Sequence, residues 1–407
     1  MPSRHRLPLA LTAMSIALGG GLIAAGFSPT GAAPASVSRP APSVSATESV
    51  DPAALVTSPA PTPSVDPKSS IDPKPAIPDD DGVHVDCAKG DDGNTGTLAK
   101  PLRSIRAATA RAAGPGAVIE LARGCTWTTT VRLRGDKTRL TAYGTGPLPV
   151  IDGAPTGADS VVVLTGEHQV AENIRVTNAA GNAIEVRGAG SAVRSSTVDH
   201  AGVGVLLKAR GATADRVTVR DLHMVLDTPG GDDDYGAIGF AVQASDVEIG
   251  HSSCTACRAP SSDYGYDGGF VEVWNYADGL DVHDNTGSDI QGVLEIGGDR
   301  PDSSARGIVL RHNTFRDSHG GLVLHTDGTF AVAAAAIAVT GNTITSAGSQ
   351  DPPILDGDLS NVTFEGNTVS TASFVSHSEP ARHRNNRIIL RAGAELGYPP
   401  DSTEKLD

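Results

Sequence analysis

Two kinds of short apolar strand alternate along the chain after residue 141, and this repeat restricts the fold more than any other feature. They follow each other about every 20–35 residues, a period typical of solenoids. Several strands of the first kind end in a turn with asparagine: Asn285, Asn313, Asn342 and Asn367. Asparagine tolerates the left-handed backbone conformation and can form hydrogen-bonded ladders between stacked turns. The repeat therefore predicts coils stacked one on another.

The composition supports the same interpretation. Apolar residues make up 39% of the chain and aromatic residues only 4%, so the core must consist mainly of Val, Ile, Leu and Ala. Each strand alternates apolar and polar residues, which predicts one buried face and one solvent-facing face. A single coil cannot bury its apolar face alone, whereas a stack of coils makes a continuous core. A β-sandwich is the disfavoured alternative, because sandwich strands do not interleave with this period.

The segment before the repeat has a specific pattern. It consists of a short strand, a turn rich in Gly and Asn, an Ala-rich helix expected at Arg106–Ala113, and a second strand. Its most distinctive residues are Val85–Thr97, Pro101, Ser104-Ile105, Ala107 and Pro115–Ile119. This pattern resembles the amino-terminal cap of secreted right-handed parallel β-helix proteins of the pectate-lyase-like superfamily. The likeness covers about residues 83–390.

The resemblance implies an all-β fold, a right-handed parallel β-helix (solenoid) with a short N-terminal capping helix. Members of the superfamily include polysaccharide lyases, glycoside hydrolases, sugar epimerases, phage tailspikes and non-catalytic adhesins. The resemblance therefore implies a polysaccharide or glycan partner, but it does not select the reaction.

The amino terminus, residues 1–35, is expected to be a secretory signal peptide. Arg4 and Arg6 precede an apolar run, Leu7–Phe27, and the sequence Ala33–Ala35 matches a cleavage site. The alternative is an uncleaved membrane anchor, because the run approaches the ~20 residues that span a bilayer. The glycines in the run and the small residues after it favour cleavage.

Three further segments follow. Residues 36–80 are rich in Pro, Ser and Ala and predict a disordered stalk. We expect the β-helix domain at residues 81–392 and a C-terminal tail at 393–407. A signal followed by a stalk predicts a secreted or cell-surface protein, which we expect to be monomeric and to contact a membrane only if the amino-terminal segment is uncleaved.

The formal net charge of −15 restricts the partners. Nucleic acids and anionic membrane surfaces attract basic patches, so neither is an expected partner. An acidic polymer is a less natural substrate, unless calcium or local arginines offset the repulsion.

The principal candidate catalytic residues are two glutamates in similar strands. Aligning Phe270–Val273 with Val293–Ile296 places Glu272 beside Glu295 on successive coils. If the neighbouring apolar residues point inward, both glutamates point outward, since alternate residues share a face. Adjacent strands are ~4.8 Å apart, so one of two carboxyl groups at this spacing should be hard to ionise. A general acid beside a nucleophile or base requires such a difference in pKa between the two carboxyl groups.

Acidic and aromatic residues cluster in the loops that enter the same strands. Asp267 lies five residues before Glu272 and is the third candidate catalytic carboxylate. These loops are also candidates for sugar recognition or for binding Ca²⁺ through hard oxygen ligands. We expect the substrate-binding residues to be Asp234, Asp263, Tyr264, Tyr266, Trp274 and His325.

The four cysteines form an even set in a chain expected to be exported. The simplest pairing is Cys87–Cys125 and Cys254–Cys257. A redox-active Cys-x-x-Cys would need a βαβ context, which the sequence lacks, and zinc would need further ligands nearby.

These observations predict a secreted carbohydrate-active enzyme, in the first place a glycoside hydrolase acting on a polysaccharide in a groove on the side of the β-helix. One alternative is a calcium-assisted polysaccharide lyase, so Ca²⁺ is the one cofactor left open. A lyase needs a base, but Lys208 is the only lysine in the coils after Lys137, and it lies away from the acidic loops. The other alternative is a non-catalytic carbohydrate-binding or surface module.

Overall fold

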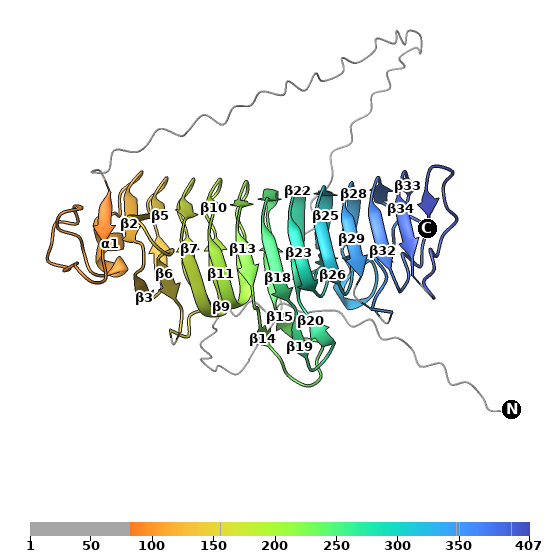
Figure 1. The fold of residues 1–407 in the computed structure, drawn as a ribbon, viewed down its shortest axis with the longest axis horizontal. Helices are drawn as coiled ribbons and strands as arrows, with labels where there is room; N and C mark the ends of the chain where they lie inside the picture. The colour runs from red at the N-terminus through yellow and green to blue at the C-terminus, as the bar shows by residue number, and fades with distance from the viewer. Residues whose placement is uncertain (1–81, 155, 347, 350, 392) are drawn as a thin grey trace, which may run out of the picture. The chain divides into compact units, whose positions relative to one another are not determined.

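The computed structural model describes residues 82–407 except 155, 347, 350 and 392. This part of the chain winds into a right-handed parallel β-helix, as predicted (Figure 1). The expected signal peptide at 1–35 and the stalk at 36–80 lie outside the described residues. Within the described part, no helix is both long enough and apolar enough to cross a membrane.

The first sheet is a single parallel ladder along the solenoid, with one strand from each coil. In spatial order its strands are β1 (Val83–Val85), β2 (Val118–Ala122), β5 (Arg139–Tyr143), β8 (Val170–Glu172), β10 (Ala192–Arg194), β12 (Thr213–Asp215), β17 (Ser245–Gly250), β22 (Tyr276–His283), β25 (Ser304–Arg311), β28 (Ala333–Thr340), β31 (Val362–Glu365) and β33 (Arg382–Arg384).

The second sheet is a parallel ladder of Thr-rich strands, most of them short and two of them, β9 (Arg175–Val186) and β11 (Thr197–Leu207), long. Its strands are β3 (Thr126–Thr128), β6 (Val150–Asp152), β9, β11, β13 (Thr218–Arg220), β18 (Ser253–Cys257), β23 (Thr286–Ile290), β26 (Thr314–Ser318), β29 (Thr343–Ser346), β32 (Thr368–Thr371), β34 (Arg387–Leu390) and β35 (Lys405–Leu406).

The third sheet carries the strands of the second kind, together with β4 (Val131–Leu133) and β7 (Ser160–Leu164), which the sequence pattern did not include. The strands of the second kind include β16 (Ile238–Val242), β21 (Gly269–Trp274), β24 (Leu294–Gly297), β27 (Leu322–Leu324) and β30 (Leu355–Gly357). The long strands β9 and β11 run through both the second and the third sheet and join them into one hydrogen-bonded set.

Each complete coil thus has three strands, where the sequence pattern suggested two. The sequence pattern does not separate the second-sheet strands as a kind of their own. It groups Asn173–Val176 and Arg216–Val219 with the first kind of strand, which is wrong, because the structure places their apolar ends in β9 and β13 of the second sheet. The reason is that a strand such as β13 directs a single apolar residue, Val219, into the core. One apolar residue between polar neighbours gives almost no periodic signal.

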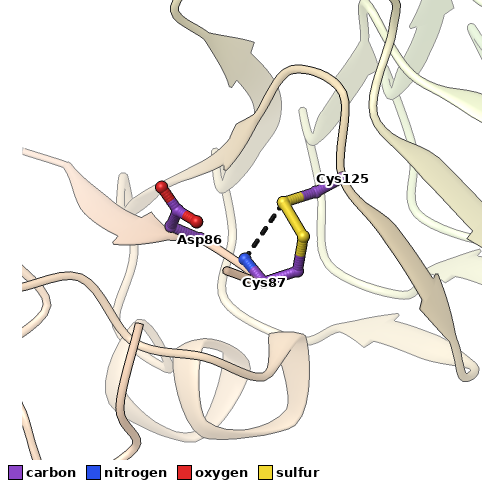
Figure 2. A group of neighbouring side chains, drawn as sticks. All are labelled: Asp86, Cys87 and Cys125. Atoms are coloured by element: carbon purple, nitrogen blue, oxygen red, sulfur yellow. Dashed lines mark hydrogen bonds between the residues drawn. A yellow bond between two sulfur atoms is a disulfide. The ribbon is translucent and has the colours of Figure 1, made fainter. Parts of the chain in front are cut away.

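The amino-terminal cap contains the expected helix, α1 (Ile105–Arg111), which begins slightly before the predicted position. The Oγ of Ser104 accepts a hydrogen bond from the Ala107 N–H at 3.1 Å and so caps the helix. The predicted disulfide Cys87–Cys125 ties the cap to the first coils, and the Cys87 N–H also donates to Cys125 Sγ at 3.0 Å (Figure 2). Because both cysteines are oxidised, they and neighbouring Asp86 do not offer a thiolate metal site.

An asparagine ladder runs along the turn between the first and second sheets, as expected. The Oδ1 of Asn313 accepts two hydrogen bonds from Asn285, one from the backbone N–H at 2.9 Å and one from the side-chain Nδ2 of Asn285 at 3.0 Å. The same pattern continues through Asn342, Asn367 and Asn386. The left-handed residue is not the asparagine but the one before it, for example Asp284 (φ 53°) and His312 (φ 56°). The asparagines therefore contribute through the hydrogen bonds of their buried amide groups and not through a left-handed backbone conformation.

Two antiparallel hairpins interrupt the coils and lie together at one side of the β-helix (Figure 1). The first pairs β14 (Met224–Leu226) with β15 (Tyr235–Gly236), and the second pairs β19 (Ala259–Ser261) with β20 (Gly265–Asp267). With the short 3-10 helix η1 (Gly328–Phe330) they help cover a small apolar cluster on the outer side of the third sheet. Residues 393–407, expected to be a tail, include β35, which pairs with β34 and extends the second sheet.

Candidate active site

Glu272 of β21 and Glu295 of β24 are direct register partners in the third sheet. Their neighbours Val271, Val273, Leu294 and Ile296 belong to the main core. Alternate residues of a strand point to opposite faces, so both glutamates project from the outer side of the β-helix. The alignment of the two strands by sequence is confirmed.

Glu272 is nevertheless buried, with 3% of its surface exposed. Its Oε1 has no hydrogen-bond partner among the described residues. Burial raises the pKa of Glu272 well above its usual value, and the negative charges of Glu295 and Asp267 raise it further. Glu272 therefore retains its proton at pH values where an ordinary glutamate is ionised.

Asp267 lies at the end of β20 and is buried against the same site. Its Oδ1 accepts a hydrogen bond from the Gly268 N–H at 2.6 Å, whereas its Oδ2 lacks a partner in the described part of the chain. Burial raises the pKa of Asp267 well above its usual value, and the charges of Glu295 and Asp234 add to this effect. The second hairpin thus brings a third acid to the glutamate pair.

His325, which follows β27, contacts Glu295 directly. Its backbone N–H donates to the Ile296 carbonyl at 3.0 Å and holds the residue in the sheet register. Its Nε2 lies 2.9 Å from Glu295 Oε1. Burial lowers the pKa of His325, but the hydrogen bond and the negative charge of Glu295 outweigh it, so the net pKa is raised. A protonated His325 would form an ion pair with Glu295.

Trp274 also projects from the outer side of β21, but it does not offer a face to solvent. Only 1% of it is exposed, and its ring packs on Phe330 with 5.6 Å between ring centroids. Gly297 lies between Trp274 and His325, and a Cβ at this position would be 2.8 Å from an atom of each ring. The absence of a side chain at Gly297 therefore allows both rings to approach the third sheet.

A pocket of about 490 Å³ opens beside His325. Phe330 and Asp232 line it together with Asp356, whose side chain continues the outward row of Glu295 on β30. Burial raises the pKa of Asp356, and its Oδ2 has no partner in the described part of the chain. Asp356 and Phe330 were missed from sequence. For Asp356, the outward position two coils beyond Glu295 was an available signal.

Asp234 and Asp263 connect the two hairpins to each other. Asp234 is fully buried and accepts hydrogen bonds from Ser261 Oγ at 2.7 Å and from the Asp263 N–H at 3.0 Å. Asp263 in turn accepts from the Gly230 N–H at 2.5 Å. Burial raises the pKa of Asp234, but the hydrogen bonds from Ser261 and the backbone outweigh it and lower the pKa overall. These carboxylates hold the cover over the third sheet.

The two candidate tyrosines occupy different environments. Tyr264 is half-buried, and its pKa is raised by burial and by the nearby acids Asp232 and Asp267. Tyr266 is 45% exposed and lies 3.8 Å under the guanidinium carbon of Arg258. Because Tyr266 and Asp267 are consecutive in β20, their side chains point to opposite faces of the hairpin. Tyr266 is thus the accessible aromatic ring of the pair.

Arginine and lysine side chains make no bond to the acidic site among the described residues. In the described part of the chain, no lysine or arginine forms an ion pair or a hydrogen bond with Asp267, Glu272 or Glu295. The nearby Arg258 instead donates to Gln291 Oε1 at 3.2 Å. The second predicted disulfide, Cys254–Cys257, is present within β18.

Comparison with known proteins supports the fold. No family model matches the chain, and no curated protein is similar to it in sequence. Among solved structures, pectate lyase Pel9A is 14% identical over 79% of this chain and 80% of its own, with a TM-score of 0.51. XylC in complex with xylose is 11% identical over 77% and 70%, with a TM-score of 0.50. A GH136 lacto-N-biosidase from Eubacterium ramulus is 14% identical over 80% and 67%, with a TM-score of 0.46.

At these identities the likeness concerns the fold. The chain is a right-handed parallel β-helix protein with the fold of the pectate-lyase-like superfamily, as its amino-terminal cap predicted. The roles of the individual site residues remain predictions.

Proposed function

We propose that the chain is a secreted carbohydrate-active enzyme, a glycoside hydrolase that cleaves a polysaccharide on the outer side of the third sheet. One observation carries the proposal: the buried Glu272, whose pKa is raised by burial, lies in register beside Glu295, which His325 contacts. Two carboxyl groups with different protonation are the minimal machinery for glycoside hydrolysis. Two of the fold neighbours are a pectate lyase and a protein in complex with xylose, and the chain has two disulfides, which are common in exported proteins; both observations agree with this function.

The environments of the two glutamates suggest their roles. Glu272 donates its proton to the leaving oxygen, because burial keeps it protonated. Glu295 attacks the anomeric carbon, because it is the less buried of the two glutamates and His325 contacts and orients its carboxyl group. Adjacent strands are about 4.8 Å apart, close to the roughly 5–5.5 Å of retaining enzymes, which favours a covalent intermediate. Asp267 is the alternative acid.

Substrate has to reach Glu272 past its cover. The pocket beside His325 is the nearest described opening, and its carboxylates can accept hydrogen bonds from sugar hydroxyl groups. Because no lysine or arginine among the described residues is bonded to the three acids, the site favours a neutral glycan over a uronic acid polymer. Because Phe330 lines this pocket and packs on Trp274, we expect Phe330 to move when a glycan passes from the pocket toward the buried Glu272.

A panel of neutral and acidic polysaccharides tests the proposal. We expect wild-type protein to release reducing ends from a neutral glycan without forming an unsaturated product, and both Glu272→Gln and Glu295→Gln to lose this activity. Glu167→Gln, at an exposed turn, is the control and should keep it. Ultraviolet-absorbing products that disappear with a chelator would identify a lyase instead. Retention of a glycan without either signal would identify a binding module.

A further inference from the structure

A second group of titratable side chains lies at the turn between the first and second sheets, on a different side of the coils from Glu272. His251 and Asp284 occupy equivalent left-handed turn positions, with φ values of 51° and 53°, on successive coils. His283 is the last residue of β22 and directly precedes Asp284. The stacking of the coils therefore brings two imidazoles and a carboxylate together.

The three side chains are close enough to share one ion. One potential ligand atom from each of His251, His283 and Asp284 lies within 4.8 Å of the other two. The imidazole rings meet edge to face with 5.4 Å between centroids, and His283 Nδ1 lies 2.9 Å from Asp284 Oδ2. A Cβ at Gly250 would lie 2.7 Å from His283 Cε1, so this glycine provides the space in which the ring lies.

Each imidazole also contacts a second carboxylate outside the group. His251 Nδ1 lies 2.9 Å from Asp215 Oδ1, and His283 Nε2 lies 3.2 Å from Glu248 Oε1. Histidines that bind metals usually donate their other ring N–H to a carboxylate, which fixes the ring and its tautomer. If these two nitrogens are the donors, His251 Nε2 and His283 Nδ1 remain as lone-pair ligands beside Asp284.

We propose that His251, His283 and Asp284 form a binding site for a divalent first-row transition ion such as Zn²⁺ or Cu²⁺. The bound ion would take the place of the proton in the hydrogen bond between His283 Nδ1 and Asp284 Oδ2. Two nitrogens and one carboxylate suit these ions, whereas Ca²⁺ and Mg²⁺ require oxygen ligands. Three protein ligands leave the fourth position of a tetrahedral Zn²⁺ to water.

The surrounding charges permit a cation. The nearby guanidinium groups are themselves paired with carboxylates, Arg216 with Asp215 and Arg311 with Asp281. The side chain of His283 is only 9% exposed, so it offers a preformed ligand. His251 and Asp284 are exposed to solvent, so the ion can enter from their side. The ion would connect the turn after β17 to the turn after β22.

Zinc titration of tag-free, chelator-treated protein by calorimetry tests the proposal. We expect one ion per chain, no displacement by excess Ca²⁺, and loss of the binding in His251→Gln and His283→Gln. Asp215→Asn and Glu248→Gln, which remove only the outer carboxylates, should weaken binding by about 10–100-fold. His168→Gln is the matched control, because His168 is also an exposed histidine with a left-handed backbone (φ 53°).

A second measurement separates binding from folding. Melting temperatures without metal should be similar for all the variants. Zn²⁺ should raise that of the wild type and of His168→Gln fully, raise those of Asp215→Asn and Glu248→Gln by less, and leave those of His251→Gln and His283→Gln unchanged. Visible absorption of bound Co²⁺ should report nitrogen and oxygen ligands and should vanish in His283→Gln. The proposal is overturned if wild-type protein binds no Zn²⁺ at this stoichiometry, or if His251→Gln and His283→Gln bind it as the wild type does.

Discussion

Glu272 and Glu295 are register partners on adjacent parallel strands, yet only 3% of Glu272 is exposed, whereas the Glu295 side chain is 21% exposed. One carboxyl group is thereby held in its neutral form, while the other contacts His325 and the solvent side. The sheet supplies the spacing between the two acids, and the inserted segments supply the difference between their environments. A hydrolase requires both.

Leaving-group dependence should distinguish the two glutamates. Loss of a general acid typically costs about 10²–10⁴-fold in rate. We expect Glu272→Gln to lose this much on natural glycans and much less on aryl glycosides whose leaving groups need no proton, because the acid is then dispensable. Glu295→Gln should be inactive on both substrates. Equal losses for the two variants on both substrates would contradict the assigned roles.

The stereochemistry of the product should follow from the spacing of the strands. Because parallel neighbours are about 4.8 Å apart, we expect the first product to keep the anomeric configuration of the substrate. Proton NMR of the early reaction mixture, recorded before mutarotation, gives the answer. An inverted first product would mean that water attacks directly and that Glu295, or another acid, acts as a base.

The pH dependence of stability should report the buried proton of Glu272. The pKa of Glu272 in the folded protein is raised above its value in the unfolded chain, so between these two pKa values the folded state holds a proton that the unfolded state has lost. The free energy of unfolding therefore falls as the pH rises from the unfolded pKa to the folded pKa. Glu272→Gln removes this loss. We expect the variant to match the wild type near pH 4 and to melt at a higher temperature than the wild type near pH 8.

The matched control for this measurement is Glu167→Gln, which should follow the wild-type curve at every pH because Glu167 is exposed. Asp267→Asn should behave like Glu272→Gln, since the pKa of Asp267 is raised for the same reason. Parallel curves for all four proteins would show that neither buried acid keeps its proton.

Gly297→Ala should damage the site from within the sheet. The added methyl group would lie 2.8 Å from both Trp274 and His325, and overpacking of this kind costs about 1–3 kcal/mol. We expect a lower melting temperature and a fall in kcat, because His325 is displaced from Glu295. Gly114→Ala is the control, since nothing lies within 4 Å of its Cβ position, and it should leave both quantities unchanged.

Asn313→Ala should show how much the ladder stabilises the solenoid. Its side chain donates to the Val282 carbonyl and to Asn342 Oδ1 and accepts two bonds from Asn285, all in the interior. Each buried partner left unsatisfied costs about 1–3 kcal/mol, so we expect a loss of several kcal/mol in urea unfolding. Exposed Asn361→Ala should be nearly neutral. A similar small effect at Asn313 would mean that the ladder is dispensable.

Much of the fold follows from local patterns in the sequence. The spacing of the strands predicted stacked coils, and the alternation of residues in Phe270–Val273 and Val293–Ile296 predicted both the register and the outward direction of the glutamates. These inferences succeed because every coil repeats the same backbone geometry, so neighbours in space can be found by aligning neighbours in sequence. The cysteine pairing succeeded for a simpler reason, the even number of cysteines and their positions.

Only the tertiary structure decided the features that do not follow the repeat. Trp274 was expected to line an open groove, but the Phe330 segment covers it. Asp234 was expected near substrate, but Ser261 and the backbone of the second hairpin occupy its oxygens. Hairpins and loops obey no period, so their path over the third sheet cannot be obtained by alignment. The sequence by itself determined which side chains share a face of the solenoid. The folded inserts decided which of those side chains are buried, because burial depends on contacts between segments that no local pattern encodes.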